Sequence, residues 1–188
     1  GKHNLYNIMC AAAATSLLGL TNKEIQNGVA SLTHVPGRFE TIPIGQPFKV
    51  IVDYAHTPDA LENVLKLCRQ LTKGRIFCVF GCGGNRDRGK RPMMGKVAAS
   101  HSDYIILTSD NPRWEDPRKI TQSIRTGMLS IEGSYEVLLD RREAIARALK
   151  LATSGDIVLV AGKGHETYQE IEGKQLHFND REVIMEVQ

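Results

Sequence analysis

From residue 48 onward, short apolar runs alternate with segments of helical periodicity, and this alternation limits the possible folds more than any other feature. Apolar runs that predict strands lie at 48–53, 75–80, 104–108, 135–138 and 157–160. Helical segments lie between them at 57–71, 91–100, 117–128 and 141–152. Because parallel strands need crossovers of this length, the sequence predicts an α/β fold with a mostly parallel sheet and helices on both faces.

The N-terminal segment has a purely helical pattern. Residues 3–19 and 21–30 predict two helices, the first capped by Asn4. Thr21 caps the second helix, and Glu24 three residues later completes a capping box.

A break in periodicity at 34–38 predicts a hinge between domains. The length of 188 residues suits one domain and a piece of another. We therefore expect one domain boundary, with segments 1–36 and 37–188 on its two sides.

The C-terminal tail carries a different signal from the alternating region. Residues 167–178 predict a hairpin that turns at Gly173 and Lys174. A last short helix is expected after Asp180.

Composition excludes several classes of protein. With 41% hydrophobic and 24% charged residues the chain is not a disordered tail, and a net charge of +3 is too weak to indicate nucleic-acid binding. We find no signal peptide and no apolar run near the ~20 residues of a membrane span. The four cysteines include no CxxC pair, which favours buried thiols in a reducing cytosol over disulfides or zinc. A cytoplasmic location is expected.

Four polar, glycine-rich segments each follow a predicted strand. They lie at 53–57, 81–87, 110–113 and 162–166. Ligands of such sheets bind outside the carboxyl ends of the strands. The sequence therefore predicts a binding site where these four segments converge.

Residues 84–91 nearly spell a phosphate-binding P-loop but lack the Ser or Thr after Lys90 that would hold Mg²⁺. We reject a complete nucleotide site here. The cluster of Arg86, Arg88, Lys90 and Arg91 could bind a carboxylate or phosphate, and a solvated basic loop is the alternative.

Asp110, Asn111, Pro112 and Arg113 combine a carboxylate, an amide, a rigid turn and a guanidinium. This mixture suits a zwitterion, with Arg113 holding a carboxylate and Asn111 donating or accepting a hydrogen bond. A simple Asn-Pro turn is the alternative.

The remaining strand-end side chains allow several roles. Glu166 could take an ammonium or be a surface acid, and His165 could be a general base or a structural histidine. Asp53 is a candidate partner for a ribose or a metal-bound water, while Thr57 is expected only to cap a helix.

The segments HNLYNIMCAAAA, VPGRFE, VDYAHTPDAL, GCGGNRDRGKRPMMG, SDNPRWEDP and VAGKGHETYQ, in this order and spacing, resemble the C-terminal part of Mur ligases, most closely the MurE type. The resemblance implies a Rossmann-like domain that binds an amino acid, preceded by the last helices of a central ATPase domain. It implies ATP and Mg²⁺ as cofactors, both bound mostly outside this chain, with no metal site in it. The isolated chain is then expected to be inactive.

The resemblance also implies the substrates. They are meso-diaminopimelate and a UDP-N-acetylmuramoyl-L-alanyl-D-glutamate dipeptide, joined through an acyl phosphate. The expected diaminopimelate contacts are Arg86, Asp110, Asn111, Pro112, Arg113, Gly162 and Glu166. Arg113 would bind the distal carboxylate, which lysine lacks. The expected nucleotide-proximal residues are Asn7, Arg38 and Asp53, and no catalytic residue is assigned beyond His165 as a candidate.

Other interpretations stay open. The chain could belong to a folylpolyglutamate synthetase or a D-alanyl-D-alanine-adding ligase, or it could be a non-catalytic interaction domain. A monomer without nucleic-acid or membrane partners is expected. Trp114 stands where many relatives have a small or polar residue, and the sequence gives it no function.

Overall fold

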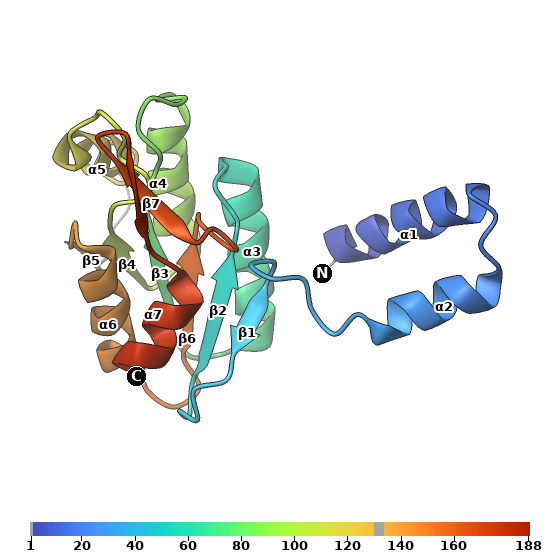
Figure 1. Cartoon of the computed structure of the whole chain (residues 1–188). Helices are drawn as coiled ribbons and strands as arrows, with labels where there is room; N and C mark the ends of the chain where they lie inside the picture. Colours follow the sequence, from blue (N-terminus) through green and yellow to red (C-terminus); the bar gives the residue numbers. More distant parts are fainter. Residues whose placement is uncertain (1, 130–133) are drawn as a thin grey trace. The chain divides into compact units, whose positions relative to one another are not determined.

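The structure, a computed structural model, describes residues 2–129 and 134–188 (Figure 1). The chain divides between Val35 and Pro36 into two compact units, called here the N-terminal and the C-terminal unit. No helix in these described ranges is long and apolar enough to cross a membrane.

The N-terminal unit consists of two helices, α1 (Lys2–Leu17) and α2 (Asn22–Ser31). Gly19 has a φ of 90°, which suits a glycine that ends a helix. The predicted capping box is present, because Thr21 and Glu24 bond each other's backbone amides. The prediction that Asn4 caps α1 is wrong, since Lys2 already lies in the helix and Asn4 is inside its first turn.

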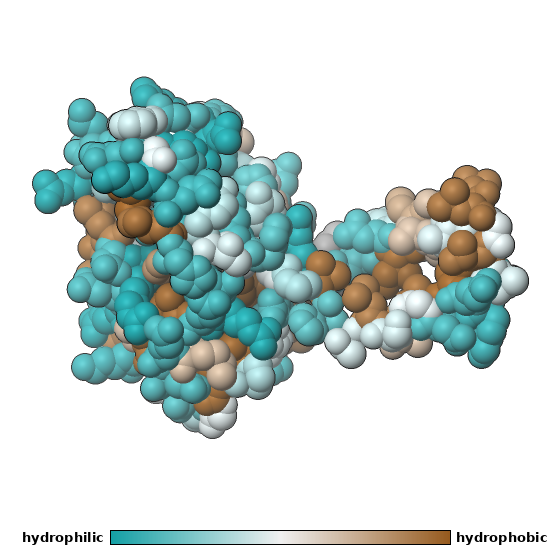
Figure 2. All heavy atoms as spheres, in the orientation of Figure 1, coloured by the Kyte–Doolittle hydropathy of each residue, from teal (hydrophilic) through white to brown (hydrophobic). Residues whose placement is uncertain are grey.

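These two helices leave much apolar surface exposed. Large exposed side chains on α1 and the turn after it include Leu5, Tyr6, Met9, Leu17 and Leu18, and Figure 2 shows apolar atoms on the surface of this unit. None of the described α2 side chains is buried. Short helices gain most of their stability from packing of their apolar faces. The apolar side chains named above are not packed by contacts between α1 and α2.

The C-terminal unit is built on a six-stranded sheet with the order β1-β2-β6-β3-β4-β5. Five strands run parallel, as predicted, and β1 pairs antiparallel with β2 at one edge. The strands are β1 (Glu40–Ile42), β2 (Lys49–Asp53), β3 (Ile76–Phe80), β4 (Tyr104–Leu107), β5 (Ser134–Val137) and β6 (Ile157–Ala161). The sequence did not predict β1, because three residues are too few to show an alternating pattern.

Helices cover both faces of this sheet (Figure 1). One core cluster joins the sheet to α3 (Pro58–Leu71), α4 (Lys90–His101) and α5 (Pro117–Arg125). The other joins it to α6 (Arg141–Leu151) and α7 (Asp180–Val187). Alternate residues of one strand, such as Cys78 and Val79 of β3, belong to different clusters, as the pleat requires. The predicted α/β architecture is confirmed.

A separate hairpin pairs β7 (Tyr168–Ile171) with β8 (Lys174–His177). Its turn residues are Glu172 and Gly173, with φ values of 50° and 74°. The turn therefore lies one residue earlier than predicted, because a two-residue hairpin turn of this kind needs positive φ at both central positions. The hairpin also contacts the loop after β4 through a parallel bridge between Arg113 and Ile171.

Candidate functional site

The four polar segments, called here the strand-end loops, meet at the carboxyl edge of the sheet. The amide of Gly162 donates to the carbonyl of Asp53 at 3.0 Å, which joins the loops after β6 and β2. The amide of Gly84 donates to the carbonyl of Asn111 at 2.9 Å, which joins the loops after β3 and β4. Asn111 Nδ2 donates to Glu166 Oε2 at 2.9 Å, which joins the loops after β4 and β6. The predicted convergence is confirmed.

Two glycines allow the loops after β3 and β4 to approach so closely. A Cβ on Gly81 would lie 2.1 Å from the carbonyl oxygen of Thr108, and one on Gly84 would lie 1.9 Å from that of Pro112. Real Cβ atoms do not approach backbone to these distances. The glycines therefore set the contact between the two loops by steric necessity rather than by their flexibility.

Lys163 lies at the centre of the site. Its side chain is fully buried, with Nζ 2.8 Å from Glu166 Oε2 and 3.0 Å from Asn111 Oδ1. The ammonium also lies 5.6 Å from the ring centroid of Tyr168. Sequence reasoning missed this residue; the available signal was a lysine between two glycines in a strand-end loop.

Asn111 is buried and its side-chain amide is used by protein partners on both sides. Oδ1 accepts from the amide of Glu170 at 3.0 Å as well as from Lys163, and Nδ2 donates to Glu166. The amide thus fixes the relative positions of the loop after β6 and the hairpin. Its expected contact with a ligand stays a prediction.

Glu166 is ionised at neutral pH. Burial raises its pKa, but the hydrogen bond and charge of Lys163, with smaller contributions from Asn111 and Arg113, bring the pKa below the usual value. Its side chain keeps 21% of its surface exposed. A carboxylate that is held in place and still accessible suits a ligand ammonium.

Arg113 has a φ of 52°, a left-handed conformation that is uncommon for a residue with a side chain. Its Nε lies 2.9 Å from Glu170 Oε2, and Nη1 donates to the carbonyl of Gly84 at 3.0 Å. Nη2 makes no hydrogen bond to any residue within 2–129 or 134–188. The guanidinium is therefore held in place on two sides with one terminal nitrogen available.

Asp110, Pro112 and Gly162 shape the surroundings of Arg113. Asp110 Oδ1 accepts from the amide of Asn111 at 2.7 Å, and Pro112 is buried against the loop after β3. A Cβ on Gly162, which has a φ of 113°, would lie 2.9 Å from Asp110 Oδ2. These three residues are brought into the site through their backbones and the Asp110 carboxylate.

Arg86 of the predicted basic cluster shares a neighbouring glycine with Arg113. A Cβ on Gly83 would lie 3.1 Å from Arg113 Nη1 and 3.5 Å from Arg86 Cγ, so the two arginine side chains flank the same glycine. Arg86 is exposed. A guanidinium is the side-chain group best suited to a carboxylate ligand.

The other three basic residues anchor the loop. Arg91 is buried and contacts both oxygens of Glu115, at 3.1 and 3.0 Å. Arg88 lies 3.3 Å from the same carboxylate, and Lys90 donates to the carbonyl of His56 at 2.7 Å. The Arg91 hydrogen bonds lower the pKa of Glu115 to about 2. These three side chains thus have protein partners, and anion binding by the cluster stays a prediction.

A second group forms around Tyr54. The guanidinium carbon of Arg38 lies 4.8 Å from the Tyr54 ring centroid, and the ring of His165 lies 5.3 Å from it. Both Asp53 oxygens accept from backbone amides, of Phe39 at 2.7 Å and Ala55 at 2.8 Å.

This second group contains most of the residues expected near a nucleotide. Arg38 lies against Tyr54, and Asp53 directly precedes Tyr54 in the chain. His165, the candidate general base, also lies against Tyr54 and is exposed. Asn7 lies on α1 in the N-terminal unit, whereas Arg38 and Asp53 belong to the C-terminal unit.

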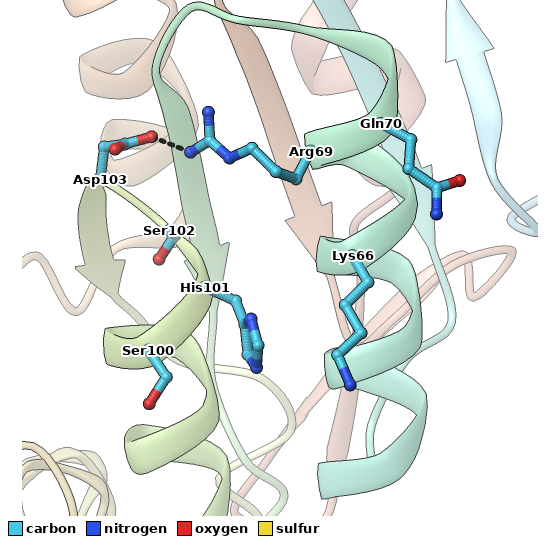
Figure 3. A pocket seen from close by; sticks show the side chains of 7 residues that line it. All are labelled: Lys66, Arg69, Gln70, Ser100, His101, Ser102 and Asp103. Carbon is cyan, nitrogen blue, oxygen red and sulfur yellow. Dashed lines mark hydrogen bonds and ion pairs between the residues drawn. The ribbon is translucent and has the colours of Figure 1, made fainter.

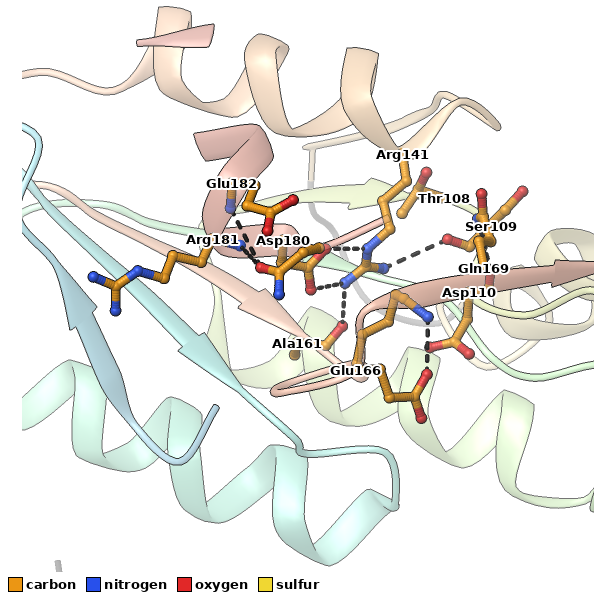
Figure 4. Close-up of polar contacts among 12 residues, drawn as sticks. Thr108, Ser109, Asp110, Arg141, Ala161, Glu166, Gln169, Asp180, Arg181 and Glu182 are labelled. Atoms are coloured by element: carbon orange, nitrogen blue, oxygen red, sulfur yellow. Dashed lines mark hydrogen bonds and ion pairs between the residues drawn. The ribbon is translucent and has the colours of Figure 1, made fainter. Parts of the chain in front are cut away.

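A fully buried ion pair between Arg141 and Asp180 lies next to the end of β6, from which one strand-end loop begins. Arg141 Nε lies 2.7 Å from Asp180 Oδ1, and Nη2 lies 2.8 Å from Oδ2. Figure 4 shows the same guanidinium reaching the carbonyl of Ala161, which it meets at 3.0 Å. Since Ala161 directly precedes Gly162, the pair ties α6 and α7 to the end of β6. Sequence reasoning missed this contact.

Two hollows lie outside the centre of the site. One, of about 720 Å³, opens beside Arg113 and Trp114. Trp114 itself is exposed, and its ring covers the hairpin turn, where a Cβ on Gly173 would lie 2.9 Å from it. The other, of about 360 Å³, lies between the carboxyl ends of α3 and α4, where Arg69 reaches Asp103 (Figure 3). The second hollow is therefore at the opposite edge of the sheet.

The charged side chains of the strand-end loops indicate which kind of ligand the site suits. Among the described residues, no group of three or more His, Cys, Asp or Glu side chains could hold a metal ion. Arg86 and Arg113 offer positive charge beside the accessible carboxylate of Glu166. This combination of charges suits a molecule that carries both a carboxylate and an ammonium group.

Comparison with known proteins shows the family to which the chain belongs. Residues 37–164 match the family described as "Mur ligase, glutamate ligase domain", and the chain belongs to the Mur ligase family. The resemblance found in the sequence is thereby confirmed.

Curated relatives show which members of the family the chain is similar to. The chain is 51% identical over 188 residues to the UDP-N-acetylmuramoyl-L-alanyl-D-glutamate--2,6-diaminopimelate ligase of Syntrophomonas wolfei, and 52% identical over 187 residues to that of Solibacter usitatus. Both alignments include 100% of this chain and 38% of the relative. The chain thus spans about two fifths of the length of these relatives.

The chain is also similar to solved structures of proteins with related names. A structure of a UDP-N-acetylmuramoyl-L-alanyl-D-glutamate--2,6-diaminopimelate ligase superposes with a TM-score of 0.77 at 41% identity, covering 98% of this chain and 38% of that one. Escherichia coli FolC in complex with ADP superposes with a TM-score of 0.66 at 26% identity, covering 85% and 36%.

Proposed function

We propose that this chain is the amino-acid-binding part of an ATP-dependent amide ligase of peptidoglycan precursor synthesis. The ligase adds meso-diaminopimelate to UDP-N-acetylmuramoyl-L-alanyl-D-glutamate. The names of the relatives support this assignment. The observation that carries it is the held guanidinium of Arg113, with Nη2 available and Arg86 and Glu166 nearby.

The distal end of meso-diaminopimelate matches these charges. Its second carboxylate pairs with Arg113 and Arg86, and its ammonium pairs with Glu166. Lysine carries the ammonium but lacks the carboxylate. Glu170 already pairs with the Nε side of Arg113, so a lysine in the same place would leave Nη2 without its acceptor. The loss of such a charged hydrogen bond discriminates between the two amino acids.

The reaction class is amide formation through an acyl phosphate. The side-chain carboxylate of the D-glutamate residue is phosphorylated by ATP, the substrate amine attacks the acyl carbon, and phosphate leaves. The role of this chain is to hold the amine in place, and such orientation contributes up to several kcal/mol to lowering the barrier. ATP and Mg²⁺ are bound mostly by the rest of the ligase, with Arg38, Asp53 and Asn7 near the nucleotide.

The two units have different roles in this proposal. Residues 1–36 are the last helices of a central ATPase domain, which accounts for the apolar surface of α1. Residues 37–188 form the C-terminal domain, and rotation about 35–38 closes the site and excludes water from the acyl phosphate. The ligase is a cytoplasmic monomer that acts on these small molecules, without nucleic-acid or membrane partners.

The test uses the intact ligase that carries this chain. Phosphate release from ATP with the UDP-linked dipeptide is measured with meso-diaminopimelate or with L-lysine. We expect release with the first only. Arg113→Ala should raise the KM for meso-diaminopimelate by about two orders of magnitude, in line with a lost charged hydrogen bond. The matched control is Arg118→Ala, at an exposed arginine of α5. Equal use of lysine, or an unchanged KM in Arg113→Ala, would contradict the proposal.

A folylpolyglutamate-type ligase is the second candidate, because the FolC structure shares the fold and glutamate also has two carboxylates. The same assay with L-glutamate and a folate acceptor separates the two. A chain that serves only as an interaction domain would support no phosphate release with any of these substrates.

A further inference from the structure

The buried ammonium of Lys163 has no role in the function as proposed so far. Its side chain is 0% exposed, although lysine is rarely buried completely. Burying an ammonium is unfavourable unless charged and polar partners surround it. The position of Lys163 in the middle of the strand-end loops therefore calls for a specific explanation.

The partners of Lys163 are two of the residues expected to recognise the amino-acid substrate. Nζ contacts Glu166 Oε2 at 2.8 Å and Asn111 Oδ1 at 3.0 Å. Asn111 Nδ2 donates to the same Oε2 at 2.9 Å. The three side chains form a closed triangle of hydrogen bonds, and each fixes the orientation of the other two.

The triangle uses only one oxygen of the Glu166 carboxylate. Both side-chain hydrogen bonds fall on Oε2, and Oε1 accepts none from any described residue. The Glu166 carboxylate is therefore fixed in one orientation, and one of its two oxygens is used by hydrogen bonds within the protein.

We propose that Lys163 is a positioning residue for the amino-acid substrate: it holds Oε2 of Glu166 so that Oε1 faces the ammonium group of the ligand. This inference rests on the proposed function. Lys163 does not touch the ligand. It acts through Glu166, by keeping the carboxylate charged and fixed in one orientation.

The surrounding charges cannot replace Lys163. Arg113 is paired with Glu170. Arg141 is paired with Asp180, although its charge reaches both Asp110 and Glu166. His165 is two residues after Lys163 in the chain but lies against Tyr54.

Without Lys163, Glu166 would still be partly buried and would lose the cation in direct contact with its carboxylate. Burial raises the pKa of Glu166, and in this case Lys163 would no longer oppose that effect. Glu166 would take up a proton at a higher pH and stop attracting an ammonium.

The experiment compares the intact ligase with its Lys163→Met variant from about pH 6 to pH 9. In the variant we expect the KM for meso-diaminopimelate to rise about tenfold near pH 7 and to rise further as the pH falls, because protonated Glu166 cannot bind the ammonium. The kcat should change less than the KM. The wild-type KM should vary less with pH over this range.

Two further variants separate positioning from a general structural defect. Glu166→Gln should also raise the KM, but without the new pH dependence, since the glutamine does not titrate. The double variant Lys163→Met/Glu166→Gln should be equally insensitive to pH. A Lys163→Met enzyme with the wild-type KM and pH profile would overturn the inference, as would a pH dependence that persists in the double variant.

A measurement on the unaltered chain covers the case in which Lys163→Met does not fold. The Nζ protons of Lys163 should exchange slowly with water in ¹⁵N NMR spectra, because the side chain is fully buried and hydrogen-bonded. Rapid exchange would overturn the inference. The two proposals fail differently: wild-type enzyme that ignores meso-diaminopimelate overturns both, whereas normal use of it by Lys163→Met overturns only this one.

Discussion

Glu170 and Arg113 pair through both their side chains and their backbones. Arg113 Nε lies 2.9 Å from Glu170 Oε2, and the amide of Arg113 donates to the carbonyl of Glu170 at 3.0 Å. The amide of Glu172 then donates to the carbonyl of Arg113 at 2.8 Å. The hairpin thus adds a strand-like partner to the loop after β4 and supplies the counter-ion of its arginine.

Removal of this counter-ion should weaken both the fold and the site. Glu170→Ala leaves the partly buried guanidinium with one anchor, and we expect a loss of about 1.5–3 kcal/mol in the free energy of unfolding. The KM for meso-diaminopimelate should rise because Arg113 is no longer held. Urea unfolding and steady-state kinetics measure the two effects. Glu172→Ala is the matched control, since only the backbone of Glu172 contacts Arg113; equal effects of the two variants would contradict this explanation.

The buried pair of Arg141 and Asp180 should be sensitive to the loss of either member. Each single variant, Arg141→Met or Asp180→Leu, leaves an unpaired buried charge and should reduce the free energy of unfolding by about 3–5 kcal/mol. The double variant should be much less destabilised than the sum, because it leaves no unpaired charge. Urea unfolding of all three proteins tests this. Additive losses would show that the two side chains do not act as a pair.

The carboxylate of Glu115 should make stability depend on acid pH. Its pKa in the folded chain is about 2, below the usual 4.5, mainly because of the Arg91 hydrogen bonds. Its contribution is therefore fully present above about pH 4.5 and is lost as the pH falls toward about 2. Glu115→Gln should be less stable than the wild type at neutral pH, and the difference should shrink over this window. Unfolding midpoints at several pH values measure it, and a constant difference would contradict the assignment.

Gly84 should tolerate no side chain. A Cβ there would lie 1.9 Å from the carbonyl oxygen of Pro112, so Gly84→Ala must move the loop that carries Arg113. We expect a loss of about 1–3 kcal/mol in stability and a raised KM. Gly28→Ala in α2 is the control, because its Cβ meets no atom within 4 Å and alanine is the better helix former. Similar losses in both variants would contradict the steric argument.

Local signals in the sequence predicted the fold well. Thr57 and Pro58 fixed the start of α3 at the observed residue, and the side chain of Thr57 accepts from the amide of Ala60 as a cap should. The apolar runs placed the five parallel strands. Since parallel strands share a direction, the polar segments that follow four of them had to meet at one edge.

Contacts between distant segments could not be read in the same way. Lys163 and Asn111 are 52 residues apart, and Arg141 and Asp180 are 39 apart. No local pattern shows that a lysine in a polar loop is buried or that an arginine at a helix start pairs with a later acid. The left-handed backbone conformation of Arg113 could not be predicted either, because it depends on hydrogen bonds between Arg113 and the β7–β8 hairpin.

The most direct test of the central claim is a crystal structure of the intact ligase with meso-diaminopimelate bound. We predict that the distal carboxylate lies within hydrogen-bonding distance of Arg113 Nη2, with the distal ammonium at Glu166 Oε1. A ligand whose distal carboxylate contacts neither Arg113 nor Arg86 would contradict the account.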